Sequence, residues 1–326
     1  MKSPITVFHF TQPTKERIAE YSKRISMHEA VICFDFEDIL MELATYSYSG
    51  YEREKLRSAI AETLIKLFSQ TENPKAGVRL NSVSSICFEQ DLRTLRLIRK
   101  KVLLDSVFLP KTESPDEILE AIEALHDYGI CFREIIPVIE TKRGMENINS
   151  LLSLKNEEFG KVAFGHCDYN RGNNYFPFFH QDTEKYWEWV RQIMSCAGYY
   201  NKMFINSPYL RLNDLSGFSK MLRRLQGIPA NEIGQITLAE RQTKLCAEFR
   251  NYQAAVEDSF TLPAENKGGS EDNLKRAVEI IVEFENNKLQ DKSISVNREK
   301  VLISPHEYAA AIEYMNIDAM KYEIAK

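Results

Sequence analysis

The chain has 326 residues, a formal charge of −5, 44% hydrophobic residues and 27% charged residues. This is the composition of an ordinary globular protein, and it excludes a collagenous, wholly disordered or disulfide-framework chain. The acidic balance also argues against a general nucleic-acid binder, because such proteins usually carry a basic excess. A local site can still bind an anion, since local charge can oppose the net charge.

The cysteines and the apolar runs bear on the compartment. The six cysteines form no C-x-x-C pair, so they predict neither a metal knuckle nor a redox pair. No run of about 20 apolar residues exists, and no membrane span is expected. Met1–Pro4 leads directly into a strand-like run and lacks the apolar stretch of a signal peptide. We therefore expect a cytoplasmic protein with neither a membrane nor a nucleic-acid partner.

Short apolar runs alternate with amphipathic stretches through most of the chain. The runs predicted as strands are Ile5–Phe10, Ala30–Phe36, Gly77–Leu80, Ser106–Leu109, Glu134–Ile139, Lys161–Phe164, Lys202–Ile205 and a weaker Gly234–Thr237. Apolar residues at three- and four-residue steps predict helices at Thr14–Ile25, Glu52–Phe68, Phe88–Lys101, Pro115–Tyr128, Asp182–Ala197 and Leu215–Leu225. Such strand–helix units predict an α/β fold, a (β/α)8 TIM barrel. An open doubly wound sheet is the alternative.

The alternation stops after about residue 254. Glu265–Ser270 predicts a polar linker, and Glu271–Leu289 and Pro305–Met320 predict helices. We therefore divide the chain into a TIM-barrel domain, residues 1–254, and a C-terminal helical extension, residues 255–326. The extension is interpreted as a lid or subunit-contact element, or alternatively as a helical hairpin that covers the barrel.

Polar groups follow successive predicted strands where each strand ends. In a TIM barrel these ends share one face, and active-site groups collect there. The candidates at these ends are Asp35, Glu37, Asp38, Arg79, Asn81, Lys111, Glu140, His166, Cys167 and Asp168. Their joint placement predicts an active site.

Glu140 and Asp168 are carboxylates at neighbouring strand ends. Hard oxygen ligands of this kind suit Mg²⁺. Arg79 carries a permanent forked cation that matches a carboxylate or an enolate oxygen. A metal and an arginine on one oxyanion stabilise an enolate. In the structural alternative, Glu140 pairs with Arg79 or Lys111 as a strut beneath the loops.

The acidic group at the end of the second strand has two interpretations. Asp35 and Glu37 flank Phe36 and share a strand face, so they could orient Arg79 or metal-bound water. Asp38 fits that role or a solvated strand end equally well. His166 could act as an acid or base, although a lone loop histidine is more often structural.

Two further features have open interpretations. His9 follows the core of the first strand and is predicted to face the barrel interior. Tyr169–Phe179 is rich in aromatic residues and follows Asp168 directly. It is either a loop that covers substrate or a buried aromatic anchor.

Five segments, in order, resemble motifs of one family. Val31–Asp38 resembles its V-I-x-D-L-E-D, Val78–Asn81 its V-R-V-N, Leu109–Ser114 its L-P-K-V-E-S, Ile139–Gly144 its I-E-T-A-R-G and Phe164–Asp168 its F-G-x-x-D. The chain is thus similar to the citrate lyase beta subunit-like proteins of the HpcH/HpaI aldolase/citrate lyase family.

The resemblance implies a TIM barrel that makes or breaks a carbon–carbon bond in a hydroxy-acid or hydroxyacyl-CoA substrate, with Mg²⁺ as cofactor. Glu140 and Asp168 would bind Mg²⁺, which would hold a keto-acid fragment, and Arg79 would polarise the substrate oxygen. Glu37 and Asp38 would support Arg79 and the metal-bound waters. The other substrate contacts it implies are Asn81, Lys111, Gly165, His166 and Cys167. A homo-oligomer, either a trimer or a hexamer, is expected.

The chain also departs from the family pattern. Phe10–Thr14 lacks the Pro-Gly-x-Arg segment that usually follows the first strand, and Gly234–Leu238 lacks a His-Pro-x-Gln turn. Val301–Pro305 corresponds to the lid motif D-G-x-M-I-D-x-P, with Ile303 in place of its second aspartate. The alternative function is therefore a catalytically degenerate barrel that binds a keto acid or CoA ester, or acts as an accessory protein.

Overall fold

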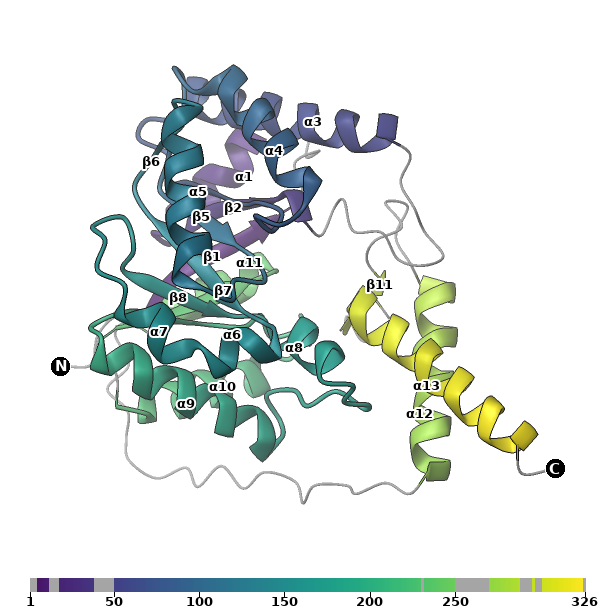
Figure 1. The fold of residues 1–326 in the computed structure, drawn as a ribbon. Coiled ribbons are helices and arrows are strands. Elements are labelled where there is room, and N and C mark those ends of the chain that lie inside the picture. Colours follow the sequence, from purple (N-terminus) through teal and green to yellow (C-terminus); the bar gives the residue numbers. More distant parts are fainter. Residues whose placement is uncertain are drawn as a thin grey trace.

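The computed structural model describes residues 5–11, 18–37, 50–229, 232–249, 270–287, 295–296 and 301–324. Eight parallel strands form a closed barrel in the order β1-β10-β9-β8-β7-β5-β3-β2, with helices around it (Figure 1). The barrel strands are β1 (Ile5–Thr11), β2 (Val31–Asp35), β3 (Ala76–Arg79), β5 (Ser106–Leu109), β7 (Ile135–Ile139), β8 (Lys161–Phe164), β9 (Met203–Asn206) and β10 (Ile233–Thr237). The predicted TIM barrel is confirmed, because β1 pairs with β10 and closes the eight-stranded sheet.

The strands read as continuous apolar runs because both of their faces are buried. One apolar cluster fills the barrel interior, where the rings of Phe8 and Phe108 meet edge to face with centroids 5.4 Å apart. A larger cluster lies between the strands and the surrounding helices. The weak eighth run is a strand whose Gly234 allows the close approach of Ile205 and Phe8.

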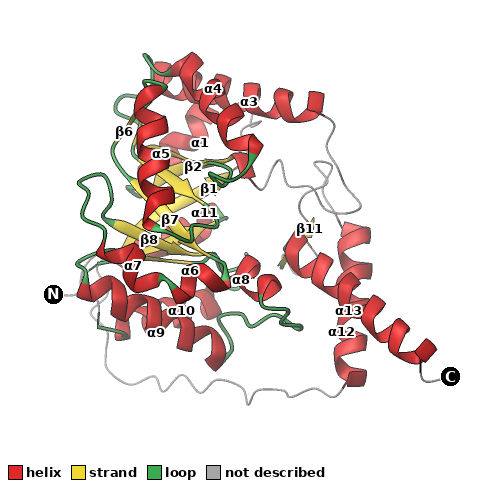
Figure 2. Cartoon of the chain, in the orientation of Figure 1, coloured by secondary structure: helices red, strands yellow, loops and turns green. Residues whose placement is uncertain are grey.

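Helices surround the barrel (Figure 2). Several of them begin at a residue whose side chain accepts a backbone N–H of the first turn. Ser114 accepts the backbone N–H of Glu117, with Pro115 at the first helical position. These helices are α1 (Ile18–Ser26), α3 (Gly50–Gln70), α4 (Ile86–Ile98), α5 (Pro115–Asp127), α6 (Lys142–Glu146), α7 (Ile148–Ser153), α8 (His166–Gly172), α9 (Glu184–Tyr199), α10 (Leu215–Gly227) and α11 (Glu240–Phe249). The short α6, α7 and α8 were not predicted, because five to seven residues carry too little periodicity.

The prediction that His9 faces the barrel interior is wrong. Phe8 belongs to the interior cluster, so the next residue along β1 points outward. His9 Nδ1 lies 3.1 Å from Thr237 Oγ1 and 2.9 Å from Thr243 Oγ1, and Nε2 lies 2.5 Å from Tyr21 Oη. The side chain thus joins β1 to the helices outside it.

The aromatic segment after Asp168 is an anchor. Tyr175 stacks on Trp189 of α9 with ring centroids 5.8 Å apart, and Phe179 meets the same indole at 5.9 Å. Phe176 contacts Tyr314 of the C-terminal extension at 4.9 Å. Of the two interpretations, these contacts favour the buried anchor.

The C-terminal extension has its own small core. It comprises α12 (Ser270–Asn287), β11 (Ser295–Val296), β12 (Leu302–Ile303) and α13 (Pro305–Ile324). Phe284 stacks on Tyr308 with centroids 4.2 Å apart, within an apolar cluster separate from those of the barrel. Figure 1 shows α13 beside the barrel, near α8. The predicted boundary at residue 254 lies outside the described residues.

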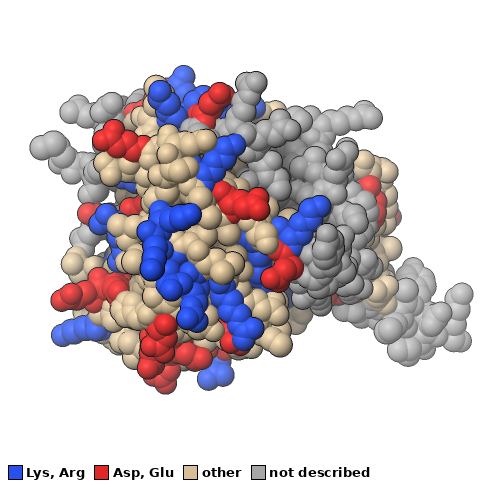
Figure 3. Space-filling view, turned by 90° about the horizontal axis from the view of Figure 1, so that it is seen from above, with Lys and Arg blue, Asp and Glu red and all other residues tan. Residues whose placement is uncertain are grey.

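The surface carries charges of both signs. In the view of Figure 3, Lys and Arg side chains run down the middle of the described face, between groups of Asp and Glu. No helix in the described ranges is both long enough and apolar enough to cross a bilayer.

Gly234 gives the first prediction. A Cβ there would lie 2.7 Å from Ile205 Cγ1, so Gly234→Ala should lower the free energy of unfolding by about 1–3 kcal/mol through overpacking. The control is Gly198→Ala in α9, where a Cβ would meet nothing within 4 Å. Alanine there should be neutral or stabilising by up to about 1 kcal/mol. Urea unfolding measures both, and equal losses would contradict the close packing at Gly234.

Candidate active site

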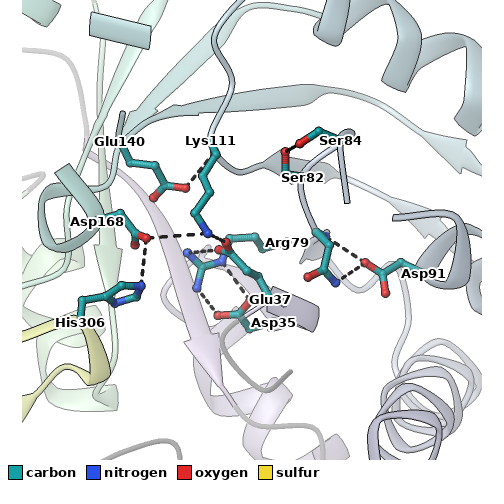
Figure 4. Close-up of polar contacts among 11 residues, drawn as sticks. Asp35, Glu37, Arg79, Ser82, Ser84, Asp91, Lys111, Glu140, Asp168 and His306 are labelled. Carbon is teal, nitrogen blue, oxygen red and sulfur yellow. Dashed lines mark hydrogen bonds and ion pairs between the residues drawn. The ribbon is translucent and has the colours of Figure 1, made fainter. Parts of the chain in front are cut away.

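Charged side chains from five neighbouring strands meet at the carboxyl end of the barrel (Figure 4). Asp35 ends β2, Arg79 ends β3, and the other members follow the ends of their strands. We call this group the mouth cluster; its members are Asp35, Glu37, Arg79, Lys111, Glu140 and Asp168. The barrel therefore brings together most of the residues predicted from the strand ends. Asp38 lies outside the described residues.

Arg79 is held by two carboxylates. Its Nε donates to Asp35 Oδ1 at 2.9 Å, and its Nη2 donates to the other oxygen of the same carboxylate. Its Nη1 lies 3.3 Å from Glu37 Oε2. A forked pair of this kind fixes the plane of the guanidinium. Asp35 and Glu37 thus do what the shared strand face predicts, since both orient Arg79.

Lys111 joins the two halves of the cluster. Its Nζ contacts Glu37 and lies 3.8 Å from Asp168 Oδ1. Its backbone N–H donates to Glu140 Oε1 at 2.9 Å. The residue has φ +52°, a left-handed conformation that is uncommon for a residue with a side chain. Burial would lower the pKa of the ammonium, but Glu37, Asp168 and Glu140 raise it overall.

Glu140 is almost completely buried and pressed against the backbone of the next strand. A Cβ at Gly165 would lie 2.1 Å from Glu140 Oε2, so no side chain can replace that glycine without displacing the carboxylate. Burial, together with the charges of Asp168 and Glu37, raises the pKa of Glu140 well above its usual range. The predicted strut is present in part, because Glu140 accepts the backbone N–H of Lys111.

Asp168 lies in the first turn of α8. Burial would raise the pKa of its carboxyl, but His306, Lys111 and Arg79 outweigh burial and lower it. His306 Nε2 lies 2.9 Å from Asp168 Oδ1. Sequence reasoning missed His306 because its position fits no ligand spacing. The sequence does contain a signal that could have indicated His306, because this residue follows the segment that resembles the lid motif and lies in the first turn of a helix that begins at Pro305.

Asn81 lies beside the cluster, but its amide is engaged elsewhere. Its backbone N–H and Nδ2 donate to Asp91 Oδ2 at 2.9 and 2.7 Å. Asp91 in turn accepts from Arg57 Nε at 3.0 Å, and both of these side chains are at most 2% exposed. The pair ties the end of β3 to α3 and α4.

His166 and Cys167 lie at the start of α8, after Gly165. The His166 ring is buried, with Nε2 3.0 Å from His180 Nδ1 and 3.7 Å from Cys167 Sγ. Burial and the neighbouring His180 lower the pKa of His166 well below its usual range. The lowered pKa favours the neutral form of the ring.

A cavity of about 690 Å³ separates the barrel loops from the extension. His180, Arg211, Arg276 and Glu307 are among the side chains that line it, and none of its lining residues belongs to the mouth cluster. The cavity therefore adjoins the extension side of the site rather than the carboxylate pair.

The buried Arg57–Asp91 pair gives a second prediction. Asp91→Ala leaves the guanidinium buried without its counter-charge and should lower the free energy of unfolding by about 3–5 kcal/mol. Arg57→Met combined with Asp91→Leu should recover only part of that loss, because it removes the uncompensated guanidinium but leaves the two Asn81 donors without their acceptor. Denaturant unfolding of the three proteins checks this. A loss below about 1 kcal/mol for Asp91→Ala would contradict a structural role for the pair.

Comparison with known proteins shows the family of this chain. The family model of HpcH/HpaI aldolase/citrate lyase matches residues 22–220, more than half of the chain. Over 79 residues the chain is 39% identical to mitochondrial citramalyl-CoA lyase from Homo sapiens, a match that covers 23% of the chain and 23% of that protein.

Solved structures share the fold at low identity. CitE from Mycobacterium tuberculosis in complex with magnesium and pyruvate matches with a TM-score of 0.58 at 16% identity, over 79% of this chain and 95% of that one. The same protein in complex with magnesium, acetoacetate and coenzyme A matches with a TM-score of 0.55 at 13% identity, over 97% of this chain and 98% of that one. On its sequence match and its barrel, the chain belongs to the HpcH/HpaI aldolase/citrate lyase family.

Proposed function

We propose that this protein is a Mg²⁺-dependent carbon–carbon lyase or aldolase of the citrate lyase beta type. Its substrate is a hydroxy acid or hydroxyacyl-CoA ester. The observation that carries the proposal is the placement of Glu140 and Asp168 beside an Arg79 whose plane is fixed by Asp35 and Glu37. Membership of the family supports it, as do the magnesium and keto-acid ligands of the CitE structure.

The residues present fit a magnesium ion. No group of three or more His, Cys, Asp and Glu suited to a metal occurs within the described ranges. The candidate ligands are the two carboxylates of Glu140 and Asp168. Mg²⁺ is commonly held by one or two carboxylates, with water and substrate completing the shell. Burial, with the charges of Asp168 and Glu37, raises the pKa of Glu140, and a bound cation would offset this crowding of carboxylates. When bound, the ion would polarise and orient the oxygens of a keto-acid fragment.

Arg79 stabilises the charge that develops during cleavage. Breaking the carbon–carbon bond moves its electron pair onto the carbonyl oxygen of one fragment, which becomes an enolate. The hydroxyl carbon of the other fragment becomes a carbonyl and gives its hydroxyl proton to a water molecule. The enolate then takes up a proton from water to give the second product. A guanidinium already fixed in its plane stabilises the enolate oxygen without reorganising during the reaction. Lys111 adds a second positive charge beside Asp168.

The remaining assignments complete the proposal. Glu37 and Asp38 support Arg79 and the metal-bound waters. The proposed substrate contacts besides Arg79 are Asn81, Lys111, Gly165, His166 and Cys167. We further propose a cytoplasmic homo-oligomer, a trimer or hexamer, built from a barrel of residues 1–254 and an extension of residues 255–326. The residue roles and the oligomer rest on the resemblance of the motifs, and the compartment and domain bounds rest on the sequence patterns.

A degenerate barrel that binds its ligand without turnover is the second candidate. Ile303 occupies the position of the second lid aspartate and is 3% exposed within the apolar core of the extension. It therefore offers the site no acid or base. Carbon–carbon cleavage detected in a screen of CoA thioesters and hydroxy acids would exclude this candidate.

The proposal is tested by calorimetric titration with Mg²⁺ together with pyruvate, oxaloacetate or glyoxylate. Wild type should bind at least one of these pairs, and Glu140→Gln should weaken Mg²⁺ binding by about tenfold or more. Glu123→Gln, an exposed position on α5, serves as the control and should bind like wild type. If no keto acid binds and Glu140→Gln behaves like wild type, the proposal fails.

Gly165 offers a second test of the same site. Gly165→Ala should displace the Glu140 carboxylate and weaken Mg²⁺ binding by about tenfold or more, with little change in secondary structure. Gly172→Ala, at the other end of α8, is the matched control because a Cβ there meets nothing within 4 Å. Titration with Mg²⁺ and circular dichroism compare the two variants. Unchanged affinity in Gly165→Ala would show that this contact does not position Glu140.

A further inference from the structure

A side chain of the C-terminal extension contacts the mouth cluster. His306 is 7% exposed, and its Nε2 lies 2.9 Å from Asp168 Oδ1. Figure 4 shows the imidazole pointing at Asp168 from the ribbon of the extension. The strand-end residues that surround Asp168 come from the barrel, so this contact joins two separate parts of the fold.

Contacts of the residues before and after His306 fix its position. Before it, the Leu302 N–H donates to the Leu210 carbonyl at 2.9 Å, which holds β12 against a barrel loop. After it, Glu307 Oε1 lies 3.6 Å from His180 Nε2. The Ser304 hydroxyl accepts the Glu307 N–H at 3.1 Å and caps the first turn of α13. The imidazole is therefore presented by a capped helix rather than by a loose tail.

The same helix braces the element that carries Asp168. Helix α13 packs on α8, where Arg171 Nη2 donates to Glu313 Oε1 at 3.0 Å. Farther along, Tyr314 packs against Phe176 in the segment that follows α8. Since α8 spans seven residues, these contacts support a helix too short to be stable alone.

Asp168 depends on His306 for its orientation. Lys111 Nζ is 3.8 Å from the same oxygen, which is beyond hydrogen-bond distance. Within the described residues, the imidazole is the group at hydrogen-bond distance from this carboxylate. A carboxylate with one such partner loses its fixed orientation when that partner is removed.

We infer that His306 is a positioning residue for Asp168, supplied by the extension of the same chain, so that Mg²⁺ affinity depends on docking of the extension. The inference rests on the proposed function, since it takes Glu140 and Asp168 as the metal ligands. Partners that hydrogen-bond to metal ligands orient them, and losing one typically costs 10–100-fold in affinity. The role requires an N–H donor at the position of Nε2.

Linkage makes the effect reciprocal. If docking of the extension strengthens Mg²⁺ binding, Mg²⁺ must strengthen docking by the same factor. Bound Mg²⁺ should therefore slow amide hydrogen exchange in residues 305–324, and it should do so less when His306 cannot donate.

The experiment titrates Mg²⁺ alone into the full chain and compares two variants of His306. His306→Phe keeps a ring and removes the donor, and it should weaken Mg²⁺ binding 10–100-fold. His306→Gln keeps an N–H donor at a similar reach and should stay within about threefold of wild type. Glu313→Gln removes an exposed ion pair between the same two helices and should change affinity less than about fivefold. Thermal unfolding confirms that each variant is folded, and hydrogen exchange of wild type and His306→Phe is measured with and without Mg²⁺.

The outcomes separate this inference from the proposed function. Wild-type affinity in His306→Phe, or equal losses in the Phe and Gln variants, overturns the positioning role and leaves the proposed function standing. A wild-type chain that binds no Mg²⁺ overturns both. Weak binding by His306→Phe, recovery in His306→Gln and slower exchange in residues 305–324 of wild type on adding Mg²⁺ support the inference.

Discussion

Like charges crowded at one end of the barrel constrain the rest of this structure. Asp35, Glu37 and Glu140 are buried there, with Asp168 beside them, and carboxylates removed from water are costly unless cations or donors compensate them. The chain supplies compensation from three directions. Arg79 comes from the neighbouring strand, Lys111 from a loop, and His306 from the extension. Their contacts with the carboxylates are Arg79–Asp35, Arg79–Glu37, Lys111–Glu37 and His306–Asp168.

The barrel can hold these carboxylates close together because its rigid strands keep them at fixed distances from the cations that compensate their charge. Residues outside the cluster serve the same end: Gly165 gives Glu140 its space, and Asp91 anchors Asn81 behind Arg79. Catalytic electrostatics depends on groups that are already in place before the reaction begins. The chemistry proposed for this chain therefore depends on groups that the barrel itself holds in place.

Local patterns predicted much of the fold and part of the site. Alternating strand and helix periods identified the barrel, and the spacing around Phe36 placed two carboxylates on the face that contacts Arg79. The orientation of His9 was wrong because a shift of one residue along a strand reverses its face. His306 was missed because the lid-like segment before it indicates where the extension begins but not that this residue contacts Asp168, which depends on how the extension docks. Asn81 was placed correctly, but its partner Asp91 lies on the following helix and is not evident from spacing.

Lys111 combines an unfavourable backbone conformation with a charge that the mouth cluster needs. Its left-handed backbone, at φ +52°, is one that glycine adopts freely and that costs other residues on the order of 1–3 kcal/mol. In return, one residue gives a backbone N–H to Glu140 and an ammonium to Glu37. The backbone conformation therefore favours glycine at this position, whereas the neighbouring carboxylates favour lysine. With lysine here, the local backbone is less stable than it would be with glycine, and in exchange a cation lies among the buried carboxylates.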